Sequence, residues 1–296
     1  MAVIETNTKS SLHLRSNSLP SSPHPLVSQF EDNLKILNNS EGTTSLSSSS
    51  VCNKLNGMQD LNDCIGKLLQ LPTEQQALSR ECNERSVNDL LEGSLRILDI
   101  CSIAKDFLSL SKENMYELQS VIRRKRGIET GFTVEGVKYM AFRKNMKKQI
   151  RKALVNLKTM KNESIDSSSN KDNNSSPMFG LLKEAEAVTL YSLEHLLLFI
   201  SDPKGHSKHS RWSIISKLMH SKRAVSDSQE SDTNEFEKVD SALLSLISHN
   251  KTSSADNFQS HMENLEICIQ DLEIGVEHIS RKLIRNRVSL LNIFNH

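Results

Sequence analysis

Apolar residues in the C-terminal part of the chain recur at alternating steps of three and four. The series consists of Phe258, Met262, Leu265, Ile269, Leu272, Val276, Ile279, Leu283, Leu290 and Ile293, and only Asn286 interrupts it. Such steps place side chains along one side of an α-helix, which then packs against other helices. We therefore predict a long helix from Phe258 to Ile293.

Further apolar residues of this helix lie outside that seam. Ile267, Ile274 and Val288 occupy the opposite face, and Ile284 and Leu291 occupy a flank. A helix that is apolar on several sides is normally buried among its neighbours. We expect this helix to be central and surrounded by others. Asn286 could fix its register, either within one chain or between two copies.

A second seam of the same kind runs from Val87 to Ile122. Ser94, Ala104 and Ser111 are its small members, where a neighbouring helix can approach closely. A helix of this length spans about 55 Å, which exceeds the width of a compact domain. Two such helices predict an elongated bundle of long, coiled-coil-like helices.

Shorter periodic segments predict the other helices, which run from about Leu26 to Leu37, Val51 to Leu71, Met178 to Ile200 and Phe236 to Ile247. Thr73 and Gln76 form a capping-box pattern that predicts a short helix just after Pro72. Polar stretches predict loops near 38–50, 162–177, 201–210, 224–234 and 248–257. The fold class is therefore all-α, with one helical domain over 26–296 and a disordered Ser-rich tail over 1–25.

Composition indicates an aliphatic core and a reducing compartment. The chain is 36% hydrophobic but only 4% aromatic, and its five cysteines form no CxxC pair. We interpret these cysteines as packing residues. The N-terminus lacks a signal peptide, Ala2 excludes myristoylation, and the most apolar run, Leu193 to Ile200, is far shorter than a membrane span. We expect a cytoplasmic protein that is neither secreted nor transmembrane, although peripheral membrane contact stays open.

The segment from Arg123 to Lys161 is strongly basic. It holds thirteen Lys or Arg against two Glu, a net charge of +11, while the whole chain carries +1. The candidate basic surface in this segment consists of Arg123, Arg124, Lys125, Arg126, Lys144, Lys147, Lys148, Arg151 and Lys152. The apolar residues expected on the opposite side of the helix are Val137, Met140, Ile150, Leu154 and Leu157.

Three interpretations of the candidate basic surface are open. Its side chains could pair with acidic neighbours in the bundle, or they could bind anionic lipid head groups. Nucleic acid or calmodulin-type binding is disfavoured, because Tyr139 and Phe142 are the only aromatic residues between Lys138 and Lys161 and no reader motif occurs. The basic stretch from Lys204 to Arg223, which contains Trp212, likewise fits either membrane contact or docking on the bundle.

The tail contains a candidate phosphorylation motif, Arg15-Ser16-Asn17-Ser18-Leu19-Pro20. An arginine three residues before Ser18 suits a basophilic kinase. Phosphorylated Ser18, with Arg15 before it and Pro20 after it, would resemble the RSxSxP ligand of 14-3-3 proteins, whose arginine cluster binds the phosphate. The alternative is an unmodified tail with a chance match.

No catalytic, metal or cofactor motif accompanies these patterns. The sequence has no glycine-rich phosphate loop, GxSxG elbow, HExxH or Asp-rich metal loop. His206, His209 and His220 have no carboxylate at ligand spacing. We therefore expect no cofactor and no enzymatic activity.

Six segments, in chain order, are RSNSLPSSPHPLVSQFEDNL, SVCNKLNGMQDLNDCIGKLLQLP, LLEGSLRILDICSIAKDFL, SRWSIISKLMHSKR, FEKVDSALLSLI and IQDLEIGVEHISRKLIRNRVSLLNIFNH. Together they resemble the plant BYPASS-type family, a group defined by a plant domain of unknown function. The resemblance covers nearly the whole chain. It implies a predominantly helical land-plant protein in a family associated with root and shoot development. It implies no catalytic residue, ligand or cofactor.

The leading hypothesis is a non-enzymatic helical adaptor or regulatory protein with protein partners, 14-3-3 proteins among the candidates. The alternative is a peripheral membrane protein that binds anionic lipid through the basic helix. Whether the long seams close on each other or on a second copy of the chain is open.

Overall fold

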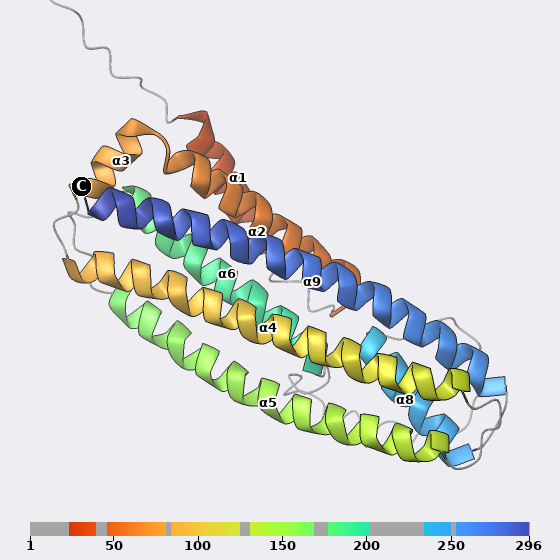
Figure 1. Ribbon diagram of the computed structural model, residues 1–296. Coiled ribbons are helices and arrows are strands. Elements are labelled where there is room, and N and C mark those ends of the chain that lie inside the picture. The colour runs from red at the N-terminus through yellow and green to blue at the C-terminus, as the bar shows by residue number, and fades with distance from the viewer. Residues whose placement is uncertain are drawn as a thin grey trace, which may run out of the picture.

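The computed structural model is an elongated bundle in which the longest helices run along its length (Figure 1). It describes residues 24–39, 46–80, 84–124, 131–168, 177–201, 234–249 and 253–295. The helices in these ranges are α1 (Pro25–Asn39), α2 (Ser48–Leu68), α3 (Pro72–Ser79), α4 (Glu84–Arg124), α5 (Gly131–Ser168), α6 (Pro177–Ser201), α8 (Glu235–His249) and α9 (Ser253–Phe294). The predicted all-α fold with long helices is therefore confirmed.

Several helix boundaries differ from the sequence prediction. Helix α9 begins at Ser253, inside the loop predicted over 248–257. Helix α5 continues to Ser168, into the loop predicted over 162–177. Helix α3 begins at Pro72 after the N-cap residue Leu71, and no side chain caps it, so the predicted capping box at Thr73 is wrong. Proline suits the first helical position because its φ is already helical and no N–H partner is needed there.

The two long seams are buried as predicted. Every apolar member of the α9 seam is buried, and α9 packs against α2, α4 and α8. On α4, Ala104 and Ser111 are buried, and the Ser111 hydroxyl lies 3.3 Å from the Met146 sulfur of α5. This contact confirms that a small residue of the seam allows close approach of a neighbouring helix.

Helix α6, and not α9, is the central helix. It contacts α1, α2, α3, α4 and α5, and it lies behind α4 and α9 in Figure 1. Its buried residues occupy all sides, including Leu190, Leu193, Leu196, Leu197 and Ile200. A segment without a continuous polar face lowers its free energy most when it is covered on every side.

Helix α9 correspondingly has an uncovered side. Ile267, Ile274, Ile284 and Val288 are 60%, 49%, 51% and 50% exposed. The expectation that other helices surround α9 is therefore wrong for this face. In Figure 1, α9 runs along the near side of the bundle with no described helix over it.

Buried polar side chains on α6 are satisfied mainly by the helix itself. The Thr189 hydroxyl donates to the Ala185 carbonyl at 2.7 Å, and the Ser192 hydroxyl donates to the Val188 carbonyl at 2.9 Å. Such bonds to the preceding turn let hydroxyl groups be buried without an unpaired donor. Helix α6 can therefore carry small polar residues in the interior.

His195 is the exception on α6. Its side chain is buried, and its Nδ1 atom has no hydrogen-bond partner among the described residues. The ring lies 6.5 Å from the Tyr191 ring, and the Lys54 ammonium group of α2 lies 5.1 Å from the same tyrosine ring. Burial, with the nearby Lys54 charge, lowers the pKa of His195 to about 4.

This lowered pKa predicts a loss of stability in mild acid. The unfolded chain protonates His195 below its ordinary pKa of 6.5, whereas the folded chain keeps it neutral down to about 4. Stability should therefore fall as the pH drops from 6.5 to 4. Urea unfolding at several pH values should give a flatter slope for His195→Leu. The same substitution at His261, a half-buried histidine, serves as the control. Equal slopes of stability against pH for His195→Leu and His261→Leu would contradict the prediction.

Candidate functional site

Helix α5 carries basic side chains on two different sides. Lys144, Lys148, Arg151 and Lys152 are exposed on its outer side, together with Val155, which is 65% exposed. No carboxylate among the described residues forms an ion pair with these four basic side chains. They form a positively charged outer face that the bundle does not neutralise.

The remaining members of the candidate basic surface lie elsewhere. Arg123 is exposed near the end of α4, and Arg124 is the last residue of that helix. Lys125 and Arg126 lie outside the described residues. Lys147 turns toward the bundle interior, so the structure does not bring the nine predicted residues together on one face.

The motif residues Arg15, Ser18 and Pro20 and the segment around Trp212 also lie outside the described residues.

Within α5, Val137 is 54% exposed, which contradicts its predicted place on the buried side. It lies instead on the outer side of the helix, the same side as Val155 and the exposed lysines.

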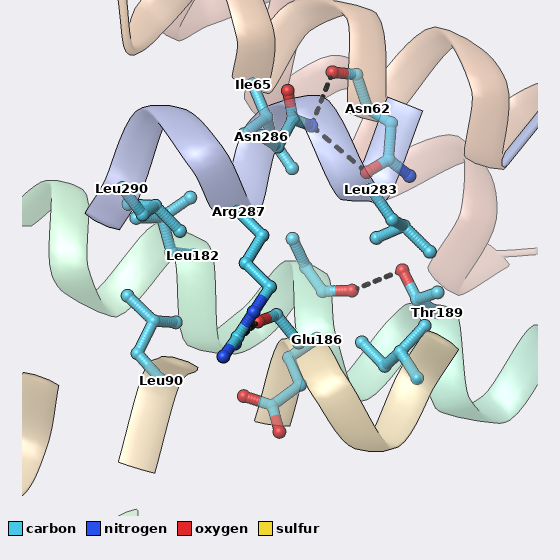
Figure 2. A pocket seen from close by; sticks show the side chains of 13 residues that line it. Asn62, Ile65, Leu90, Leu182, Glu186, Thr189, Leu283, Asn286, Arg287 and Leu290 are labelled. Atoms are coloured by element: carbon cyan, nitrogen blue, oxygen red, sulfur yellow. Dashed lines mark hydrogen bonds between the residues drawn. The ribbon is translucent and has the colours of Figure 1, made fainter. Parts of the chain in front are cut away.

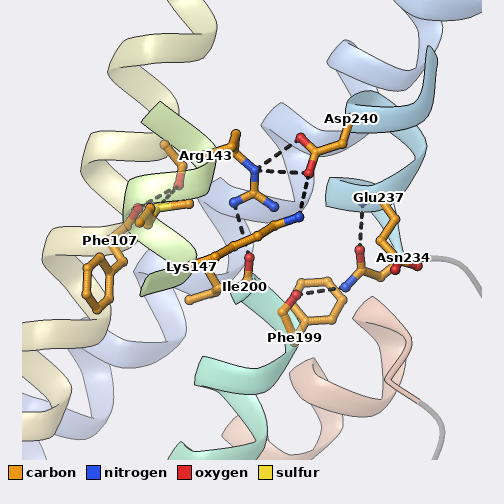
Figure 3. Close-up of polar contacts among 10 residues, drawn as sticks. Phe107, Arg143, Lys147, Phe199, Ile200, Asn234, Glu237 and Asp240 are labelled. Atoms are coloured by element: carbon orange, nitrogen blue, oxygen red, sulfur yellow. Dashed lines mark hydrogen bonds and ion pairs between the residues drawn. The ribbon is translucent and has the colours of Figure 1, made fainter. Parts of the chain in front are cut away.

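The inner side of α5 contains a buried ion-pair cluster, shown in Figure 3. The Arg143 side chain is only 2% exposed, and its Nε donates to Asp240 Oδ1 of α8 at 3.1 Å. Lys147 Nζ lies 3.0 Å from Asp240 Oδ2. The Arg143 guanidinium also lies 4.6 Å from the centre of the Phe236 ring. The Asp240 carboxylate thus pairs with two cations from successive turns of α5.

The same cluster completes the end of α6. Arg143 Nη1 donates to the Ile200 carbonyl at 3.2 Å, and Asn234 Nδ2 donates to the Phe199 carbonyl at 2.7 Å. The last carbonyls of a helix have no partners within it, so these side chains supply them. Asn234 Oδ1 also accepts from the Glu237 backbone N–H at 2.9 Å, which caps the start of α8. The cluster therefore ties α5, α6 and α8 together.

Sequence reasoning missed this cluster, although a signal for it exists. Arg143 stands in register with the buried residues Tyr139, Met146 and Ile150, at steps of four, three and four. A charged residue in an apolar seam requires a buried partner of opposite charge. The sequence does not say which acidic residue provides that partner, because Asp240 is distant along the chain.

A small pocket lies where α2, α4, α6 and α9 meet, and Figure 2 shows the side chains that line it. Its volume of about 50 Å³ suits a few water molecules. Asn286 Nδ2 donates to the Asn62 carbonyl at 3.0 Å, and Arg287 Nη1 donates to the Ser94 hydroxyl at 2.7 Å. These polar groups are thus engaged in holding α9 against α2 and α4.

Glu186 lies at the same pocket in an unusually tight place. A side chain at Gly93 would put its Cβ 2.1 Å from a Glu186 carboxylate oxygen, so α4 and the carboxylate approach each other only because residue 93 is glycine. Burial raises the pKa of Glu186, and the nearby Lys183, 3.1 Å away, opposes this rise. The carboxylate is held by its own helix and faces a space too small for a typical substrate.

The thiols of the described residues have a packing environment. Cys64, Cys101 and Cys268 are buried, and burial raises the pKa of the Cys101 thiol to about 12. A protonated thiol is a poor nucleophile and metal ligand.

Among the described residues, no three His, Cys, Asp or Glu lie close enough together to hold a metal ion. No described helix is long and apolar enough to cross a membrane.

The buried cluster predicts a large effect of one substitution. Asp240→Asn leaves the Arg143 guanidinium buried without a counter-charge, which should lower the free energy of unfolding by about 3–5 kcal/mol. Urea unfolding followed by circular dichroism measures it. The double variant Arg143→Met with Asp240→Leu should lose less than Asp240→Asn alone, because the fully buried cation is gone and only Lys147, whose side chain is partly exposed, is left without its carboxylate.

The matched control for this experiment is Asp99→Asn on the exposed side of α4. An exposed substitution should change the free energy of unfolding by no more than about 0.5 kcal/mol. If Asp240→Asn behaved like this control, the ion pair would contribute little to stability.

The comparisons with known proteins agree with the resemblance found in the sequence. A family model described as Protein BPS1 matches residues 54–293, from within α2 to the end of α9. No curated protein and no solved structure matches the chain. The matched range contains the central helix, the ion-pair cluster and the exposed basic side chains of α5. The chain belongs to the BPS1 family.

Proposed function

We propose that this protein is a non-enzymatic helical adaptor that works in the cytoplasm. Membership of the BPS1 family implies a role in plant development, and the BPS1 family is not a known enzyme family. In this proposal, protein partners dock on the outer faces of the bundle, and phosphorylation of Ser18 in the tail regulates their binding. The roles expected for this protein are in root and shoot development.

The observation that carries this proposal is the contrast between the inside and the outside of the bundle. The buried polar groups around Arg143 and Asn286 hold helices together. The outer faces of α5 and α9, by contrast, expose isoleucine, valine and lysine side chains. Exposed apolar side chains rimmed by charges are typical of protein interaction sites. The surfaces proposed to bind partners are therefore the outer faces of the bundle.

The tail motif gives the first test. Affinity purification from plant tissue should recover 14-3-3 proteins with the wild-type chain but not with Ser18→Ala, because a phosphate on Ser18 is required by the arginine cluster of these proteins. Ser22→Ala is the matched control, since it removes a serine hydroxyl of the same tail but leaves every residue from Arg15 to Pro20 in place. An unchanged set of partners for Ser18→Ala would remove the tail from the proposal.

A second candidate function is binding to an anionic membrane surface through the outer face of α5. Lys144, Lys148, Arg151 and Lys152 are exposed, and Val155 stands among them. Each basic side chain near such a surface contributes about 1 kcal/mol. An apolar side chain between lysines adds contact with the head-group region.

Sedimentation with vesicles tests this second function. Vesicles containing phosphatidylserine should retain the wild-type chain at low salt, and changing the four basic residues of α5 to Gln should weaken binding about 100-fold or more. A control with the same loss of charge changes the exposed residues Lys35, Lys67, Arg85 and Lys238 to Gln. If both variants lost binding equally, net charge and not this face would be responsible.

A further inference from the structure

The uncovered side of α9 has the pattern of a second, unused helix interface. Its exposed apolar residues, here called the α9 ridge, are Ile267, Ile274, Ile284 and Val288. Ile267, Ile274 and Val288 fall on one seven-residue repeat, in which Arg281 takes the remaining position, and Ile284 falls three residues after it. An apolar residue at every seventh position, with others three residues further on, is the seam of a left-handed coiled coil.

The other sides of α9 are already used within the chain. Toward α4, Glu266 accepts from Tyr116 at 2.9 Å, and Glu273 pairs with Lys112 at 2.9 Å. Toward α2, Lys282 pairs with Asp63. The α9 ridge is therefore a separate stripe of the helix, which the described part of the bundle does not use.

The charges beside the ridge divide the helix into two halves. Glu263 and Asp271 are exposed in the N-terminal half, whereas Arg281 and Arg285 are exposed in the C-terminal half, with His278 between them. Arg281 also bonds Glu277 at 2.9 Å. A face that is acidic at one end and basic at the other complements a second copy of itself in the antiparallel orientation.

One register satisfies both the charges and the apolar contacts. Asp271 and Arg285 each lie seven residues from His278. When His278 faces His278 of a second copy, Asp271 of each chain faces Arg285 of the other. In a coiled coil with this register, Ile274 packs against Ile284 of the second copy, because antiparallel helices pair the first and fourth positions of the repeat.

We propose that two copies of this chain associate through the α9 ridge as an antiparallel, two-fold symmetric pair. The choice of a second copy rests on the coincidence of two independent patterns. The contact of Ile274 with Ile284 and the pairing of Asp271 with Arg285 follow from one and the same two-fold axis, which an unrelated partner would not require. Such an interface uses the same surface on both chains.

The first test measures the mass of the full-length chain in solution. Sedimentation equilibrium should give twice the 33.4 kDa of the single chain, with a concentration-dependent dissociation to monomer. Ile274→Glu should weaken association at least tenfold, since in each half of the symmetric pair it buries a carboxylate against Ile284 of the second copy. Ile36→Glu, at a 65% exposed position of α1, is the matched control and should leave association unchanged.

The second test exchanges the flanking charges. Asp271→Arg alone or Arg285→Asp alone places like charges opposite each other and should weaken association, whereas the two changes together restore the attraction and should restore the dimer. Asp271 and Arg285 are both exposed in the single chain, so circular dichroism should show unchanged helix content for every charge variant.

Four results would overturn the proposal. The first is a mass of 33.4 kDa at every concentration tested. The second is a dimer that Ile274→Glu leaves intact, which would place the interface elsewhere. The third is a double charge exchange that fails to restore association, which would exclude the antiparallel register. A monomer from which Ile274→Glu removes a different protein partner would assign the ridge to that partner and equally overturn the dimer.

Discussion

The structure depends on the burial of α6, a helix without a continuous polar face. Its apolar residues lose contact with water only if neighbours cover every side, and each buried leucine or isoleucine stabilises the fold by about 1.5–3 kcal/mol. Helices α1 to α5 supply that cover. Because these neighbours surround α6, each of them turns one side inward and one side outward. The inward sides make the core, and the outward sides are the surfaces available for partners.

Burying the end of α6 also determines how the basic helix is used. The carbonyls of Phe199 and Ile200 end inside the bundle, where an unpaired acceptor would be costly. Arg143 enters the interior to bond one of them and requires Asp240 as its counter-charge. Lys147 shares that carboxylate. The charge of α5 is thereby divided: one part stabilises the fold, and the outer part is exposed and forms no ion pair with a described carboxylate.

The covering of α6 also explains why α9 has an open side. Helix α9 packs its main seam between α2 and α4 and contributes to the core from one side only. Ile267 and Ile274 therefore remain exposed although the sequence places them on a second apolar stripe. From sequence alone these residues predicted a helix buried all round. In the bundle, the same residues become a surface, because the central place is occupied by α6.

The sequence by itself determined the helices and their buried seams, since periodicity is a local property: a residue such as Met262 or Leu108 faces inward because its neighbours at steps of three and four do so. The candidate motif of Arg15, Ser18 and Pro20 is likewise a local pattern, and it stays a prediction. Only the tertiary structure decided which helix lies at the centre and which cation of α5 is buried. Those outcomes depend on contacts between residues far apart in the chain, such as Arg143 with Asp240, and no local pattern specifies such a pair.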